Sequence, residues 1–163
     1  MLAAAGRAAA AAVTEPGLLQ SLADSLADQF ADWAIVDVVC DGQPRRAVAS
    51  HLAAPLLSRE LASARAQECP LVQDAITRNT PAVMASLDDP RLLGALPDGR
   101  PVADALHAHS AAVGPISADG SACCGAITIV RGPERPYVGF GELQALSRVA
   151  DLAAAAMNRL RRR

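Results

Sequence analysis

Two adjacent cysteines, Cys123 and Cys124, are the side chains of this sequence whose type most directly suggests chemistry. They lie in Ala122–Val130, an apolar run rich in β-branched residues that predicts a strand. Successive side chains of a strand point to opposite faces, so the two thiols are predicted to lie on opposite sides of a sheet. Metal-binding cysteine pairs usually have two residues between them. We therefore interpret both cysteines as small buried residues.

Two histidines, His107 and His109, are separated by a single residue. From an extended chain they could bind one metal ion together, and either could be the axial ligand of a haem. No third ligand accompanies them at a recognisable spacing. We interpret them as part of a polar corner between a helix and a strand, and keep haem binding through His107 or His109 as the weaker alternative. No metal site and no cofactor is assigned from the sequence.

Other sequence patterns of catalysis are missing. No serine stands in a Gly-x-Ser-x-Gly context, and a phosphate-binding loop with its lysine is excluded because the chain contains no lysine. No pair of acidic residues has a context that suggests acid–base catalysis. We therefore predict that the chain is not an enzyme.

Composition narrows the kinds of partner. The net charge is −2 and aromatic residues make up 2% of the chain, which does not fit a basic groove with aromatic platforms for single-stranded nucleic acid. The arginines near the end are interpreted as a solvated helix terminus. No run approaches the ~20 apolar residues of a membrane span, and the Ala-rich start does not fit a secretory signal. We expect a cytoplasmic protein with reduced cysteines that binds neither nucleic acid nor membrane.

The strands that must position these groups follow from short apolar runs. The turn sequence Ala118-Asp-Gly-Ser121 predicts a hairpin between Ser110–Ile116 and Ala122–Val130. Asp41-Gly42 predicts a second hairpin, whose strands are Trp33–Cys40 and Arg45–Ser50. The arginines of the returning strand are typical of an edge strand. A short fifth strand is predicted at Ala82–Ser86.

Helices are predicted before, between and after these strands. Thr14-Glu15-Pro16 is typical of a helix start. Residues 51–79 have a helical pattern with a break near Cys69-Pro70, and Val102–His107 is predicted as a short helix. Residues 1–13 are of low complexity, either disordered or an extension of the first helix. The mixed order predicts one α+β domain over residues 14–163, with a central antiparallel sheet flanked by helices.

The final helix, predicted from about Phe140 to the end, is the clearest element. Its apolar residues alternate spacings of three and four, which is typical of a helix–helix seam. We predict that this seam packs on the N-terminal helix and on the same helices of a second copy, giving a homodimer. The alternative is an amphipathic helix packed on its own sheet. The predicted seam residues are Leu19, Leu22, Leu26, Phe30, Leu143, Leu146, Ala150, Ala153, Met157 and Leu160.

Several of these segments resemble a known family when taken in order. Ser110-Ala-Ala-Val-Gly-Pro-Ile116, the Asp-Gly turn and Gly125-Ala-Ile-Thr-Ile-Val130 resemble the end of a GAF domain. Phe30-Ala-Asp-Trp-Ala-Ile-Val-Asp-Val-Val39 and Pro70-Leu-Val-Gln-Asp-Ala-Ile-Thr-Arg-Asn-Thr-Pro-Ala-Val83 are similar to its earlier parts, as found in actinobacterial sensor proteins joined to PP2C-type phosphatases or histidine kinases. The resemblance covers roughly 18–160.

The resemblance implies a ligand pocket between the sheet and the segment 88–109. Asp37 interrupts an apolar strand within this region. If it is buried it needs a partner, such as a ligand amine or a nearby arginine. If strand alternation turns it outward it needs none, and the sequence leaves both readings open. The candidate pocket residues are Ile35, Asp37, Val39, Met84, His109, Val113, Cys124 and Ala126.

The function that the resemblance implies is that of a non-catalytic sensory or regulatory domain in signal transduction. It would bind a small molecule or a partner and relay the change through its terminal helices to an output domain or partner of the phosphatase or kinase type. One alternative is a dimerisation scaffold without a ligand. The other is a cysteine-dependent reductase of the same fold, like the free methionine sulfoxide reductases, whose cysteine-bearing loop motifs do not appear in this sequence.

Overall fold

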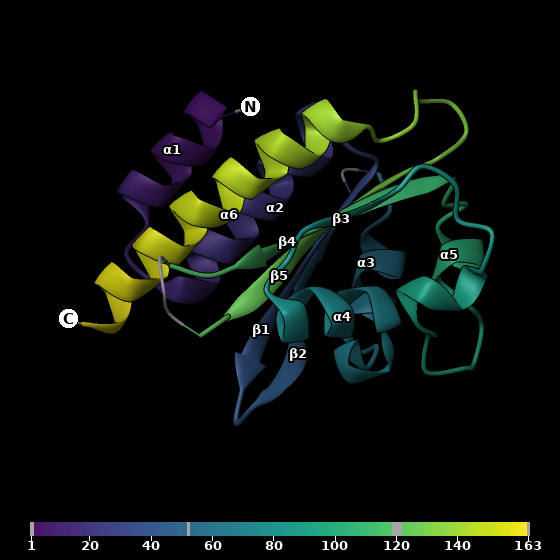
Figure 1. Ribbon diagram of the computed structural model, residues 1–163, viewed down its shortest axis with the longest axis horizontal. Coiled ribbons are helices and arrows are strands. Elements are labelled where there is room, and N and C mark those ends of the chain that lie inside the picture. The colour runs from purple at the N-terminus through teal and green to yellow at the C-terminus, as the bar shows by residue number, and fades with distance from the viewer. Residues whose placement is uncertain (1, 52, 119–121, 163) are drawn as a thin grey trace.

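A five-stranded antiparallel sheet forms the centre of the protein, and helices cover both of its faces (Figure 1). The computed structural model describes residues 2–51, 53–118 and 122–162. Both terminal helices lie on one face of the sheet, in contact with each other, and the mid-chain helices lie on the other. The predicted α+β architecture is therefore confirmed. Within the described ranges, no helix is long and apolar enough to cross a membrane.

The strand order in the sheet is β2-β1-β5-β4-β3, and every neighbouring pair is antiparallel. β1 and β4 have the predicted limits because their apolar, β-branched runs end at clear turn residues. β2 and β3 are the two edges of the sheet. The strands are β1 (Trp33–Cys40), β2 (Gln43–Ser50), β3 (Ala82–Met84), β4 (Ser110–Ile116) and β5 (Gly125–Arg131).

The start of β5 corrects the prediction for the two cysteines. The strand begins at Gly125, so Cys123 and Cys124 precede it and do not alternate across the sheet. A Cβ at Gly125 would overlap the carbonyl oxygen of Asp37 on β1, so the strands approach closely only because this residue is glycine. The Asp-Gly-Ser part of the predicted turn lies outside the described residues.

Local sequence signals fix where the two main helices begin. The hydroxyl of Thr14 accepts a hydrogen bond from the Gly17 backbone N–H at 3.3 Å, and Pro16 occupies the first turn of α2. The Glu142 carboxylate accepts from the Gly139 N–H at 2.9 Å and so caps α6. The helices are α1 (Leu2–Ala11), α2 (Glu15–Gln29), α3 (Pro55–Ala62), α4 (Pro70–Arg78), α5 (Val102–Ala105) and α6 (Phe140–Arg161), with short 3₁₀ helices η1 (Ala66–Glu68) and η2 (Pro90–Leu93).

The terminal helices form a layer of their own. α6 packs on β4, α2 and α1, while α2 covers β1 and β2. Figure 1 shows α1 lying along α6, on the side of the sheet where both termini are found. The predicted seam residues are buried or packed against this core within one chain. A second copy would therefore have to use other parts of the helix surfaces, and the homodimer stays a prediction.

Candidate functional site

The two faces of the sheet bury different kinds of residue. The face under the terminal helices is apolar, with Ala34 and Val36 of β1 in its core. The alternate residues of β1, Trp33 and Ile35, belong to a second core beneath the mid-chain helices. Asp37 continues this second series and is fully buried. The mid-chain face is thus where polar groups enter the interior of the domain.

Asp37 is paired with Arg46 of β2. The Arg46 Nε donates to Asp37 Oδ1 at 2.9 Å and its Nη2 donates to Oδ2 at 3.4 Å. The side chains are 0% and 2% exposed for Asp37 and Arg46 respectively. Burial lowers the pKa of the Arg46 guanidinium, but the Asp37 carboxylate and the Cys69 side chain together raise it by more, so the net shift is upward and the arginine stays charged. Of the two alternatives for Asp37, the structure has the buried one, with an arginine as partner.

A β-bulge brings the two residues together. The β1–β2 register shifts between Val36 and Asp37, so that Val36 lies opposite Val48 while Asp37 lies opposite Arg46. Ala47 is the extra residue. In a regular ladder without the bulge, Asp37 would lie opposite Ala47, and Arg46 would lie opposite Val38. Since directly opposed residues of antiparallel strands share a face, the bulge turns Arg46 to the mid-chain side, where alternation along β1 already places Asp37.

Cys69 links this ion pair to the mid-chain layer. Its side chain contacts that of Arg46, and its thiol donates a hydrogen bond to the Leu92 carbonyl at 3.3 Å. Cys69 lies where η1 ends and α4 begins, and it is 1% exposed. Burial raises the pKa of this thiol. The side chain is therefore a neutral thiol at neutral pH and a poor nucleophile.

The Thr128 hydroxyl is a buried polar group with no hydrogen-bond partner among the described residues. Thr128 is 1% exposed on β5, opposite Ile35 of β1 and Val113 of β4. These neighbours belong to the mid-chain core, so the hydroxyl points to the same side as the Asp37–Arg46 pair. An unpaired buried hydroxyl costs about 1–3 kcal/mol and calls for a partner such as a bound polar molecule.

Most of the predicted pocket residues are on this face. Ile35, Val113 and Ala126 are buried in the mid-chain core, and Met84 packs against it. Val39 is half-buried near the end of β1. These side chains and the Asp37–Arg46 pair share one face of the sheet. The mid-chain helices that cover this face were predicted only as a helical pattern over residues 51–79 and a short helix near residue 102.

Three predicted residues lie elsewhere. Cys124 packs against the core under the terminal helices, because the chain bends ahead of Gly125 and both its N–H and its thiol bond to the Ile116 carbonyl. His109 is half-buried and stacks on Tyr137, with ring centroids 4.7 Å apart. His107 is exposed with a φ of 50°. No group of three metal-ligating side chains is found in the described part of the chain.

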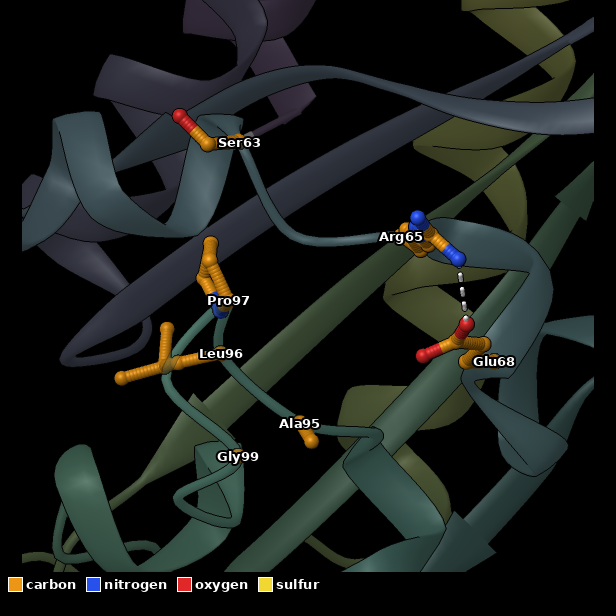
Figure 2. A pocket seen from close by; sticks show the side chains of 7 residues that line it. All are labelled: Ser63, Arg65, Glu68, Ala95, Leu96, Pro97 and Gly99. Atoms are coloured by element: carbon orange, nitrogen blue, oxygen red, sulfur yellow. Dashed lines mark hydrogen bonds and ion pairs between the residues drawn. The ribbon is translucent and has the colours of Figure 1, made fainter.

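A surface cleft of about 330 Å³ opens between η1 and the loop 95–99 (Figure 2). Its charged residues, Arg65 and Glu68, are paired with each other at 3.2 Å. Leu96 lines this cleft and also belongs to the mid-chain core, so the cleft lies on the outer side of the layer that covers the polar pair. Figure 2 shows Ser63 and Pro97 near one end and the ion pair near the other.

A second polar centre joins the sheet to the terminal helices. Arg131, at the end of β5, donates from Nε to the Phe30 carbonyl at 2.9 Å. Its Nη1 donates to the Pro136 carbonyl at 3.2 Å and to Glu142 Oε1 at 3.3 Å. Through one nearly buried side chain, the sheet is fastened to the end of α2 and the start of α6.

The neighbouring connection is fixed in the same way. The Asp32 carboxylate accepts from the Gly132 N–H at 2.7 Å and from Arg135 Nε at 2.8 Å. The buried Ser110 hydroxyl accepts from the Val138 N–H at 3.0 Å. The segment between β5 and α6 is therefore tied at several points, and a displacement of the sheet would be transmitted to the start of α6.

Sequence reasoning missed Arg46, Thr128 and Arg131 as site residues. A carboxylate in an apolar strand next to a hairpin with two arginines did indicate a pair, but which arginine turns inward depends on the bulge at Ala47. Thr128 had no signal, because threonine is common in strands. Arg131 acts through carbonyls that no sequence pattern identifies.

Comparisons with known proteins identify the fold. No family model and no curated protein matches the sequence. The structure is similar to the GAF domain of the Acinetobacter phosphoenolpyruvate-protein phosphotransferase (TM-score 0.75, 10% identity, 99% of this chain and 92% of that one). It is similar to the GAF domain/HD domain protein from Geobacter sulfurreducens (TM-score 0.72, 15% identity, 93% of this chain and 96% of that one). It is also similar to the free methionine-R-sulfoxide reductase from Neisseria meningitidis, solved with its substrate (TM-score 0.71, 20% identity, 99% of this chain and 88% of that one). The fold of this chain is that of a GAF domain.

Proposed function

We propose that the chain is a non-catalytic sensory or regulatory GAF domain of a signalling protein, which binds a small polar molecule on the mid-chain face of its sheet. The observation that carries the proposal is the unpartnered Thr128 hydroxyl on the same buried face as the Asp37–Arg46 pair. A ligand with a polar group at this place would satisfy the hydroxyl and use the charge of the pair.

The relay would pass through the Arg131 centre. A ligand between the sheet and the mid-chain helices would shift β5, which carries Thr128 and ends at Arg131. Arg131 holds both the end of α2 and the start of α6, so two arrangements of the sheet would give two arrangements of the terminal helices. In a homodimer these helices would carry the change to an output domain or partner of the phosphatase or kinase type, as in the actinobacterial sensors that the sequence resembles.

The first test is mass spectrometry of one purified sample under native and denaturing conditions. An added mass that is lost on denaturation identifies the bound compound, and the native mass gives the oligomeric state. The compound is then titrated against the wild type and against Thr128→Val, which keeps the shape of the side chain. We expect the variant to bind at least about tenfold more weakly, because one desolvated hydrogen bond is lost.

Two results would contradict the proposal. One is equal affinity of the wild type and Thr128→Val, which would place the compound elsewhere. The other is the absence of any bound mass together with no thermal shift in a metabolite screen, which would favour the scaffold without a ligand. A monomer at high concentration would remove the homodimer from the mechanism.

A reductase is the second candidate, favoured by the similarity to the Neisseria meningitidis enzyme. Among the described residues, the mid-chain core contains one cysteine, Cys69, and its buried, neutral thiol is poorly suited to attack. Cys124 lies on the other face of the sheet. Thiol-dependent turnover of free methionine sulfoxide that is lost in Cys69→Ser would establish this function in place of the sensory one.

A further inference from the structure

Among the residues that the structure describes, no other strand pairs with the outer side of the edge strand β2. It is an end strand of the sheet, with β1 on its inner side. The Val39 N–H of β1 donates to the Cys124 carbonyl, just ahead of β5, so this residue faces β5. The alternate residues of β1 therefore face β2, including Val36 opposite Val48. The N–H and C=O groups of Ala49, between the bonded residues of β2, therefore point away from β1. An outward row of this kind is a template for one more strand.

A shallow cleft of about 360 Å³ runs along this edge. One wall is α2, with Gln20 and Asp24, and the other is α3, with Ser58 and Arg59. Its floor is formed by residues 47–50 of β2, whose side chains are mostly small, and by His51, which follows the strand. A second cleft, of about 300 Å³, continues from it past Leu19 and Val48 on the α2 side. The two clefts share Gln20, Ala47 and Val48, so open space follows the α2 side of β2 and reaches Val38 of β1.

Other features of β2 limit the pairing to a short stretch. Pro44 has no N–H, and the bulge at Ala47 interrupts the regular alternation. Both features protect the first half of the edge from pairing with other sheets. The half that stays regular, residues 48–50, is the half that the cleft follows.

The charges of the cleft indicate what kind of chain fits. The Asp24 carboxylate is already engaged, since it accepts from the Ser50 hydroxyl at 2.5 Å and from Gln20 Nε2 at 2.8 Å. Glu15, in the second cleft, is paired with Arg161 at 2.8 Å. The Arg59 side chain is exposed and has no ion-pair partner among the described residues. The α3 wall of the cleft therefore presents a positive charge, while the carboxylate of the α2 wall is held by two neutral donors.

We propose that this cleft binds an extended acidic segment of a partner protein, which adds to β2 as a sixth strand. Side chains of an added strand alternate between the two walls. Acidic residues on one face would meet Arg59 of α3, and β-branched residues on the other would pack against Leu19 and Val48 on the α2 side. A second copy of this chain fits less well, because it would bring a second Arg59, of the same charge, to the same edge.

The test uses a capped eight-residue peptide in which valine and glutamate alternate, titrated into ¹⁵N-labelled protein. We expect saturable shifts of the backbone amides of Ala47, Ala49 and Ser50. A peptide with lysine in place of glutamate, and one with alternate backbone nitrogens methylated, should each bind at least about tenfold more weakly. The first removes the charge match and the second removes the donors of the new ladder.

Two protein variants complete the design. Arg59→Glu should weaken the binding of the acidic peptide at least about tenfold. Arg148→Glu, an equal charge change on an exposed part of α6, should change the affinity for the acidic peptide by less than about twofold. Equal binding of the lysine peptide, shifts centred away from β2, or no shifts at peptide saturation would overturn the proposal. Concentration-dependent shifts at β2 without peptide would overturn it in favour of a second copy of the chain.

Discussion

The Asp37 carboxylate and the Arg46 guanidinium form an ion pair across the single point where β1 and β2 change register, with Nε and Oδ1 2.9 Å apart. The bulge residue Ala47 brings Arg46 to the mid-chain face, beside Asp37. The pair, the Cys69 thiol and the Leu92 carbonyl form a continuous polar connection from the sheet to the helices that cover it. This connection is the structural basis of the first prediction.

Asp37→Ala should destabilise the fold by about 3–5 kcal/mol, because it leaves the Arg46 charge buried without a partner. Replacing both residues by apolar ones, as in Asp37→Val with Arg46→Met, should cost less than the single change. Urea unfolding of both variants and the wild type measures the difference. A cost below about 1 kcal/mol for Asp37→Ala would show that water or a rearranged partner satisfies Arg46.

The sequence was sufficient for the elements with a strong local signal. The limits of β1 and β4 follow from apolar runs, and the start of α2 follows from Thr14 and Pro16. α1 is different: alanine on every side of a helix gives no periodic pattern, although Ala5 and Ala9 are buried against the other terminal helices. Its packing is a tertiary effect.

The site was predictable only in part, because its geometry depends on pairing between strands. Alternation along β1 does not say which face of the sheet Asp37 joins, and the register shift at Ala47 decides which arginine lies opposite it. Cys123 and Cys124 were placed in a strand because the apolar run is continuous. The sequence of one strand does not reveal that Cys124, just ahead of β5, bonds the Ile116 carbonyl through both its N–H and its thiol, nor that Gly125 lies close to the Asp37 backbone.

That close approach gives the second prediction. Gly125→Ala should destabilise the protein by about 2–4 kcal/mol, because the new Cβ meets backbone that cannot move away without breaking the β1–β5 ladder. Gly6→Ala is the matched control: a Cβ there meets nothing within 4 Å, and the helix should gain about 0.5–1 kcal/mol. Thermal unfolding of both variants tests the opposite signs. An unchanged unfolding temperature in Gly125→Ala would contradict the close approach of Gly125 to the β1 backbone.

Cysteine reactivity gives the third prediction. Burial raises the pKa of Cys69, and this thiol is 1% exposed, whereas Cys40, Cys123 and Cys124 are partly exposed. Iodoacetamide at neutral pH should modify Cys69 at least about tenfold more slowly than Cys40, as followed by mass spectrometry of peptides. In denaturant the rates should converge. Fast native labelling of Cys69 would show that the mid-chain layer opens readily, and would weaken the case for a fixed buried site.

The pH dependence of the junction gives the fourth prediction. Hydrogen bonds from the backbone N–H groups of Glu142 and Gly139, together with the charge of Arg131, lower the pKa of the Glu142 carboxyl below its ordinary value of 4.5. As pH falls below that value, the unfolded chain takes up this proton before the folded one does, so stability is lost. The contribution is complete above the ordinary pKa and disappears as pH falls through the folded-state pKa.

Glu142→Gln provides the measurement. Its unfolding free energy should lie below that of the wild type by a constant amount above about pH 6, and the gap should narrow as pH falls below about 4.5. The carboxylate is 30% exposed, so the gap should be modest, of order 1 kcal/mol or less. Denaturant titrations at several pH values give the difference curve. A gap that stays constant down to about pH 3 would mean that the Gly139 and Arg131 contacts do not hold the carboxylate in its charged form.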